Sequence, residues 1–361
     1  MVPGMFSGQR LFQIEKALQK HIIGQSEAIG AVSRVIRRAG IGIGNSNSPI
    51  GSFLFAGPLG VGKTLLAKSL AMEYFGSKES IIKLNMNEYT EKDSVSTLTE
   101  TVQNRPHSVI LLHDIHKAHH NVLKAMIQIL RDGRLTDSKG LTVHFNRNII
   151  IMTSSSAIGY HHNSDYEDYS YSDDDDSYDD SDDDDYSDDD DSDDDDDSTF
   201  EKSKANLGKD LERMLGSELF NSIDEVIVFK QLGVSGLKEI VETMIKEVCE
   251  KLIKTKNIKL TVTENFKEKL AKEAYGDNKC LNRVVCLKKA FRRLLVDNIT
   301  MGILNERVKE GAVTMDIDSF GNVHYSILPA FLLLRRPTIF VLKFYDNIIL
   351  CASARHLSSL L

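Results

Sequence analysis

SFLFAGPLGVGKT, residues 52–64, decides the fold. Its first part, residues 52–56, is an apolar run typical of a strand that is buried on both faces of a parallel sheet. The rest, GPLGVGKT, fits the pattern G-x-x-x-x-G-K-[ST] at every required place, and a helical stretch follows it over residues 65–75. The sequence therefore predicts a phosphate-binding loop between a buried strand and a helix.

Each residue type in this loop has a part in holding the phosphates of a nucleotide. Glycines let backbone N–H groups close around the phosphates, and the amino terminus of the helix adds a partial positive charge. Lys63 is expected to reach the β- and γ-phosphates, and the Thr64 hydroxyl to ligate magnesium. We therefore predict that ATP or ADP binds with Mg²⁺ at Gly57, Pro58, Leu59, Gly60, Val61, Gly62, Lys63 and Thr64.

Further short apolar runs at residues 81–84, 108–112, 148–153 and 225–229 predict more strands, and helical patterns separate them. Strands that alternate with helices predict a doubly wound α/β domain with a parallel sheet and its ligand at the carboxyl ends of the strands. After Gln231 the pattern changes to helices mixed with three strands, which predicts a second, smaller α+β domain.

The expected domains follow from these patterns. The α/β nucleotide-binding domain covers residues 1–157 and 199–231, an acidic insertion covers 158–198, the small domain covers 232–327, and an apolar and basic tail covers 328–361.

Residues 164–198 hold 21 Asp, one Glu and no Lys or Arg, within a chain that has 53 acidic and 44 basic side chains. We expect a solvated, self-repelling loop there, because such a run buries too little apolar surface to fold. It could act as a decoy for a basic partner surface, a phosphorylation target or a loose calcium site, or it could be a tolerated insertion. Outside residues 164–198 the chain has more basic than acidic side chains.

Several classes of protein are not expected. The four cysteines show no C-x-x-C pair, so we expect reduced thiols and neither a disulfide framework nor a cysteine zinc site. Charged residues interrupt the most apolar region, 328–361, before it reaches the length of a membrane span. The first residues resemble neither a signal peptide nor a transit peptide. We therefore expect a soluble intracellular protein, cytoplasmic by default, with no membrane partner.

The chain resembles a known family in several longer stretches: HIIGQSEAI, FLFAGPLGVGKTLLAKSLA, ILRDGRLTDSKGLTVHF, FNSIDEVIVFKQL and LLVDNITMGILNERVKEG. They are similar to the second ATPase module and the C-terminal small domain of the Clp chaperones, which are AAA+ unfoldases of the ClpC and ClpB type. The resemblance covers about residues 11–326.

This resemblance implies an AAA+ core in which adenine packs near Ile22 and Ile23, and ring assembly with itself or with other Clp-type subunits. It also implies ATP hydrolysis coupled to the remodelling of protein clients, and the chloroplast stroma as an alternative compartment.

The residues that should hydrolyse ATP depart from the family. The family has an Asp that holds magnesium followed by a Glu that polarises the attacking water, and here these places hold His113 and Asp114. Imidazole is a poor ligand for magnesium, and Asp is one methylene shorter than Glu. If the motif is aligned one residue further along, Asp114 would instead be the magnesium ligand, and no acidic residue would stand at the place of the base. Ser155 replaces the Asn that senses the γ-phosphate.

Other parts are altered as well. Ser222 stands at the position where members of the family have an arginine finger, which contacts the nucleotide of the neighbouring subunit. The sensor residue of the small domain has no direct equivalent, and Lys279 or, less well, Arg283 is its weak substitute. An aromatic pore loop is missing between Leu98 and Thr99. We therefore expect an ATP-binding protein whose hydrolysis is weak or lost; the alternative is a non-catalytic subunit that joins or regulates rings of intact Clp ATPases.

Three weaker signals remain. His113, His116, His119 and His120 could hold zinc or nickel, although drift at a relaxed site explains them as well. The triplet at residues 158–160 is similar to the Ile-Gly-Phe loop by which some Clp ATPases dock a peptidase. Two basic clusters, one on residues 34–38 and one on residues 288–293, favour a solvated or subunit-facing surface, so no nucleic-acid partner is expected.

Overall fold

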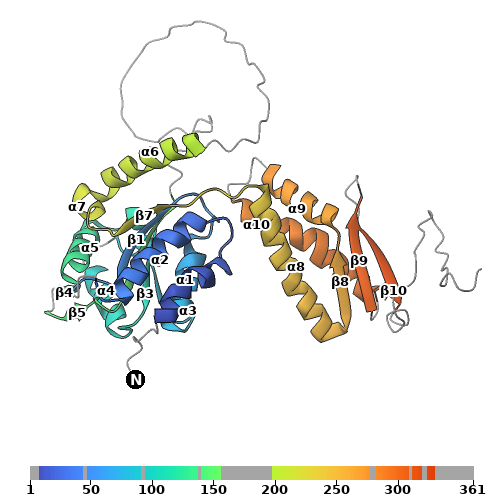
Figure 1. Cartoon of the computed structure of the whole chain (residues 1–361), viewed down its shortest axis with the longest axis horizontal. Helices are drawn as coiled ribbons and strands as arrows, with labels where there is room; N and C mark the ends of the chain where they lie inside the picture. The colour runs from blue at the N-terminus through green and yellow to red at the C-terminus, as the bar shows by residue number, and fades with distance from the viewer. Residues whose placement is uncertain are drawn as a thin grey trace, which may run out of the picture. The chain divides into compact units, whose positions relative to one another are not determined.

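A five-stranded sheet lies at the centre of the first part of the chain (Figure 1). Its strands are in the spatial order β2-β3-β6-β1-β7, and every neighbouring pair is parallel. This confirms the prediction of a parallel α/β sheet. The strand bounds are β1 (Gly51–Ala56), β2 (Ile81–Asn85), β3 (Val109–His113), β6 (Ile149–Ser154) and β7 (Glu225–Val228).

Alternate side chains of each strand enter two different cores, because successive side chains of a strand point to opposite faces. Phe53 and Phe55 pack against α1 (Gly8–Gln19), α2 (Ser26–Gly40) and α3 (Lys63–Phe75). Leu54 and Ala56 face the other core, which contains residues of the helices α4 (Ser94–Gln103), α5 (His120–Asp132), α6 (Asp197–Leu215) and α7 (Ser217–Phe220). Both faces of the sheet are therefore covered, which explains the lack of polar alternation in the strands.

A short antiparallel pair was not predicted. It consists of β4 (Arg134–Thr136) and β5 (Thr142–His144), in which only Leu135 and Val143 are buried. Each strand has three residues and one buried side chain, so the sequence shows no repeating pattern from which a strand could be predicted. Two 3₁₀ turns complete this part: η1 (Met86–Glu88), after β2, and η2 (Ile115–Lys117), after β3.

The rest of the chain forms a smaller α+β unit, as predicted. Its sheet has the order β10-β9-β8, in which β8 and β9 are parallel and β9 and β10 antiparallel. A π-helical turn, η3 (Arg292–Val296), lies between the two helices α10 (Arg283–Phe291) and α11 (Asp297–Leu304). The other elements are α8 (Val234–Lys256), β8 (Ile258–Val262), α9 (Glu264–Gly276), β9 (Gly311–Ile317) and β10 (Val323–Pro329).

This computed structural model describes residues 8–43, 47–90, 94–136, 140–155, 197–276, 282–308, 311–318 and 323–329. They divide into two compact units, the first ending at Gln231 and the second beginning at Leu232. Nearly all of the predicted acidic insertion, the triplet at residues 158–160, Lys279 and the predicted tail from residue 330 onward lie outside the described residues. No helix among the described residues is both long and apolar enough to cross a membrane.

The cysteines differ from the expectation of reduced thiols. Cys249 is free, but Cys286 is disulfide-bonded. The prediction was wrong because a single bridge requires only that two Cβ atoms come within about 4 Å in the fold, which the spacing in the sequence does not reveal.

Candidate functional site

The predicted phosphate loop lies between the end of β1 and the start of α3. Its glycines Gly57, Gly60 and Gly62 have φ angles of 135°, 85° and 108°. L-residues rarely adopt such angles, and glycine does so without strain. A Cβ on Gly57 would also lie 2.7 Å from the carbonyl oxygen of Phe229. Glycine is therefore required at the first position of the loop, both by its conformation and by its neighbour.

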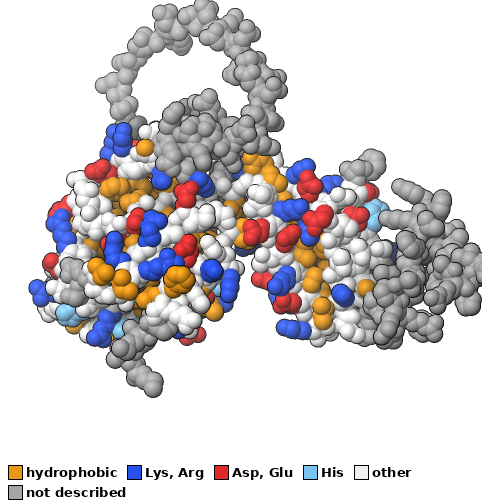
Figure 2. Space-filling view, in the orientation of Figure 1, with side chains coloured by type: hydrophobic (Ala, Val, Ile, Leu, Met, Phe, Trp, Pro, Cys, Tyr) orange, Lys and Arg blue, Asp and Glu red, His pale blue; other side chains and the backbone are white. Residues whose placement is uncertain are grey.

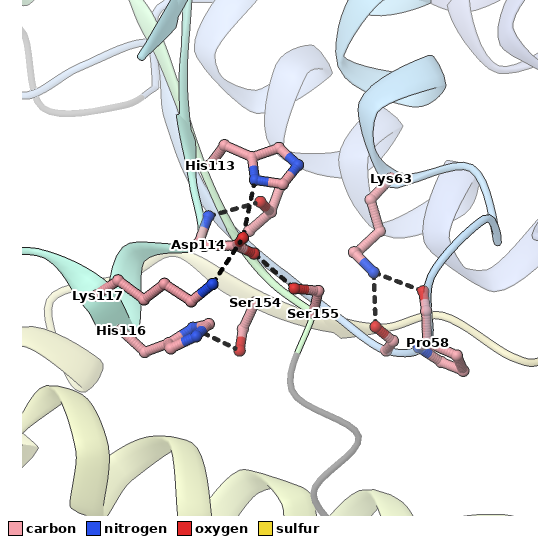
Figure 3. Close-up of polar contacts among 10 residues, drawn as sticks. Pro58, Lys63, His113, Asp114, His116, Lys117, Ser154 and Ser155 are labelled. Carbon is pink, nitrogen blue, oxygen red and sulfur yellow. Dashed lines mark hydrogen bonds and ion pairs between the residues drawn. The ribbon is translucent and has the colours of Figure 1, made fainter. Parts of the chain in front are cut away.

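Lys63 points back into this loop (Figure 3). Its Nζ donates hydrogen bonds to the carbonyl oxygens of Gly57 and Pro58, both at 2.6 Å, and the residue is 8% exposed. Burial lowers the pKa of the Lys63 ammonium to about 8, and the negative charge of Asp114 partly opposes this. Among the described residues its hydrogen-bond partners are these two backbone carbonyls, so the ammonium can exchange them for the oxygens of an anion.

The amino terminus of α3 adds further donors. Its N-cap residue, Gly62, gives no side-chain hydrogen bond, and the first turn has no acidic side chain. The first N–H groups of a helix have no partner within the helix, and together they carry a partial positive charge. Thr64 is half-buried in this turn. The loop therefore fits the phosphates of a nucleotide.

The other residues expected at the nucleotide lie in different surroundings. Ile22 is buried in the core around α1, α2 and α3, and Ile23 is half-buried beside it in the chain. Leu59 is half-exposed at the tip of the loop. Arg283 belongs to the second unit, where its guanidinium lies 4.0 Å from the ring centroid of Tyr275 and donates to the carbonyl of Leu232. It is thus already held by neighbours in the second unit.

Asp114 follows the last residue of β3 in a left-handed conformation, with φ and ψ both at 57°. One carboxylate oxygen accepts a hydrogen bond from the Ser155 hydroxyl at 2.6 Å. The other lies 3.2 Å from Nδ1 of His113 and 3.6 Å from Nζ of Lys117 (Figure 3). The structure thus brings together the three residues predicted around hydrolysis, His113, Asp114 and Ser155.

The charge state of this cluster follows from its contacts. Burial by itself would raise the pKa of the Asp114 carboxyl, but the hydrogen bond from Ser155 and the charges of His113, Lys117 and His116 lower it below its ordinary value. Asp114 is therefore ionised at neutral pH. Burial lowers the pKa of His116, although Asp114 partly opposes this. His116 also contacts Ser154, with 3.4 Å between Nδ1 and Oγ.

The end of β3 fits a magnesium ion less well than the phosphate loop fits phosphates. The ion takes oxygen ligands in octahedral geometry and is held by one or two carboxylates together with substrate phosphates. At the end of β3 the chain offers an imidazole and one carboxylate, which a hydroxyl and two basic side chains already contact. Across the described ranges, no group of three or more His, Cys, Asp or Glu side chains is arranged for a metal ion. The alternative of zinc at the histidines therefore has no support there.

Two other departures have a clear local structure. Ser222 follows α7, and its hydroxyl donates to the carbonyl oxygen of Glu218 at 2.7 Å, so it caps its own helix. Leu98 and Thr99, where the family has its pore loop, are both buried within the single helix α4. There is thus no loop between them.

Gln25 is a site residue that the sequence analysis did not single out. It is 4% exposed and stands at the N-cap position of α2, where it makes no capping bond. Its amide instead bonds to both backbone groups of Lys230, donating to the carbonyl at 2.8 Å and accepting from the N–H at 3.2 Å. It also donates to the carbonyl of Val61 in the phosphate loop, at 3.4 Å. The only signal in the sequence was a Gln just before a helix.

The first basic cluster is largely neutralised by ion pairs. Arg34 lies 3.8 Å from Glu225, Arg37 2.8 Å from Glu15, and Arg38 3.3 Å from Asp224. On the face drawn in Figure 2, Lys and Arg side chains are interspersed with Asp and Glu. Both observations favour a solvated or structural role over a nucleic-acid surface.

Comparisons with known proteins agree with the fold. Residues 48–226 match the family described as "AAA domain (Cdc48 subfamily)", and residues 232–315 match "C-terminal, D2-small domain, of ClpB protein". The chain is 41% identical over 341 residues to "Chaperone protein ClpC1, chloroplastic" of Arabidopsis thaliana. It is also 41% identical to "ATP-dependent Clp protease ATP-binding subunit ClpA homolog CD4B, chloroplastic" of Solanum lycopersicum. Each alignment covers 87% of this chain and 33% of the relative, so the chain spans about a third of their length.

Proposed function

The chain belongs to the Clp family of AAA+ proteins, of which it carries an AAA domain and the small C-terminal domain, and we propose that it binds ATP or ADP through residues 57–64. The observation that supports this most directly is the placement of Lys63. A buried ammonium with a lowered pKa, hydrogen-bonded to two carbonyls of the loop, lies at the uncapped amino terminus of a helix. Such a site favours a highly charged anion.

On binding, Lys63 exchanges the carbonyl oxygens of Gly57 and Pro58 for phosphate oxygens, and the free N–H groups at the start of α3 donate to the same phosphates. Ile22 and Ile23 pack against adenine. If magnesium accompanies the nucleotide, Thr64 and Asp114 are the residues to hold it, and it would neutralise phosphate charge.

We propose further that hydrolysis is weak. Asp114 is the only candidate base at this strand end, and its carboxylate accepts from Ser155 and lies beside His113 and Lys117. A carboxylate of lowered pKa is a weak base, and the short side chain holds it away from an attacking water. Ser222 cannot supply the guanidinium that contributes about a thousandfold or more to related phosphoryl transfers. The family activity, ATP hydrolysis coupled to protein remodelling, is thus reduced in this chain.

A second candidate function is a nucleotide-stabilised subunit that joins rings of intact Clp ATPases and regulates them. The continuous helix α4 favours it, because the described residues show no loop at this position that could carry a side chain for pulling a polypeptide. Both plant relatives are named chloroplastic, which favours the chloroplast stroma over the cytoplasm as the compartment.

One experiment tests the main proposal. Binding of a fluorescent ATP analogue and release of phosphate are measured on the same purified chain, with and without magnesium, beside a Lys63→Ala variant. We expect binding that the variant abolishes, little phosphate release, and an affinity that changes less than about tenfold when EDTA removes magnesium. Absence of binding by the unchanged chain would refute nucleotide recognition, and rapid turnover dependent on Lys63 would refute weak hydrolysis.

A further inference from the structure

The segment directly after β7 touches the phosphate loop and ends the first unit. The N–H of Phe229 donates to the carbonyl of Ala56 at 2.8 Å, and its own carbonyl oxygen occupies the space that a Cβ on Gly57 would need. Lys230 follows, and Gln231 is the last residue before the second unit. The backbone at residues 229–230 is therefore packed against the start of the loop.

Lys230 is tied to the loop by a second route. Gln25 bonds to its N–H and its carbonyl and also to the carbonyl of Val61, so one buried amide contacts both segments. The side chain of Lys230 pairs with Glu27, in the first turn of α2, at 3.1 Å. A buried amide with three hydrogen bonds holds its partners in a fixed arrangement.

Nucleotide binding changes the phosphate loop, to which Gln25 connects the backbone of Lys230. Lys63 must release the carbonyls of Gly57 and Pro58, and the loop backbone closes on the phosphates. Val61 belongs to that backbone, and its carbonyl oxygen accepts a hydrogen bond from Gln25. We infer that Gln25 is a positioning residue that couples occupancy of the phosphate loop to the backbone of Lys230, and so to the connection into the second unit. This inference rests on the proposed nucleotide binding.

Amide hydrogen exchange on the full chain, with and without ADP, reads this coupling directly. In the unchanged chain, ADP should slow exchange by about tenfold or more in a peptide that covers residues 57–66 and in one that covers 228–232. In Gln25→Met, which keeps the length of the side chain but has no hydrogen bonds, ADP should still protect the loop peptide but not residues 228–232. Its affinity for ADP should fall by about tenfold, as expected for the loss of one or two hydrogen bonds.

Asn148→Ala is the matched control. Asn148 is also buried in the first unit, and its amide donates to both the backbone and the hydroxyl of Ser108, away from the loop. This variant should lower the melting temperature, as Gln25→Met does, yet keep the protection of residues 228–232 by ADP. A purely structural role for Gln25 would make the two variants behave alike.

The outcomes separate the inference from the proposal beneath it. If ADP protects neither peptide of the unchanged chain, the proposed nucleotide binding fails, and the coupling fails with it. If ADP protects the loop but not residues 228–232, only the coupling is refuted, and this result needs no variant to fold. Unchanged protection of residues 228–232 in Gln25→Met would refute the role of Gln25.

Discussion

Lys63 carries its charge in a place where burial disfavours it. Its pKa in the folded chain is about 8, against an ordinary value of 10.5. Between these two values the unfolded chain binds more protons than the folded chain, so the free energy of unfolding rises with pH. A shift of this size corresponds to roughly 3 kcal/mol. The folded chain thus holds a charge that destabilises it at neutral pH, as expected of a residue kept for an anion.

We therefore predict opposite pH effects on stability and on binding. From pH 8 to pH 10.5, the free energy of unfolding should rise by roughly 3 kcal/mol more in the unchanged chain than in Lys63→Met. Affinity for ADP should fall over the same range, because a neutral amine no longer attracts the phosphates. Urea denaturation and ADP titration at a series of pH values check both signs. Equal pH dependence of stability in the two chains would contradict the lowered pKa of Lys63.

The end of β3 allows a repair experiment. His113→Asp together with Asp114→Glu supplies a second oxygen ligand and a base one methylene longer, so we predict that phosphate release rises by about tenfold or more. A misplacement of about one ångström is enough to cost about a hundredfold. Phosphate release is measured beside a triple variant that also carries Lys63→Ala, which should be inactive. An unchanged rate in the double variant would place the limiting defect elsewhere, with Ser222 as the next position to test.

At the scale of elements, the start of the phosphate loop depends on its contact with the segment after β7. Gly57→Ala places a Cβ 2.7 Å from the carbonyl of Phe229, at a φ of 135°. We predict a loss of about 3 kcal/mol or more in the free energy of unfolding, because strain and collision add. Gly216→Ala is the control: its φ is 82°, but no atom lies within 4 Å of the added Cβ. It should lose only about 1 kcal/mol, and equal losses in urea denaturation would contradict the collision.

Elements with strong local signals were predictable from the sequence. The parallel strands are apolar runs that enter two cores, and the phosphate loop has a fixed glycine pattern. The pair of β4 and β5 was not predictable, because each strand buries only one side chain. The role of Gln25 was equally hidden, since its partner Lys230 lies 205 residues away in the chain. The contacts of Asp114 with Ser155 depend in the same way on strands that are adjacent only in the folded sheet.

At the scale of the whole molecule, the chain keeps the phosphate-loop motif of the Clp family, and it differs from the pattern expected for the family at Ser222 and within α4. Ser222 caps its own helix, and α4 has no loop. We expect a subunit of this kind to enter a ring without contributing to ATP hydrolysis or to the remodelling of a client.

We therefore predict that the chain forms mixed oligomers with an intact ClpC-type ATPase when ATP is present, and that it lowers the ATPase rate of that partner. The rate should fall by more than the fraction of subunits replaced, because each Ser222 also leaves the neighbouring site without an arginine. Native mass spectrometry detects the mixed species, and phosphate release at several mixing ratios gives the rate. Lys63→Ala should assemble less well, since its loop lacks the charge that holds nucleotide. Separate, unmixed oligomers at every ratio would rule out the regulatory subunit.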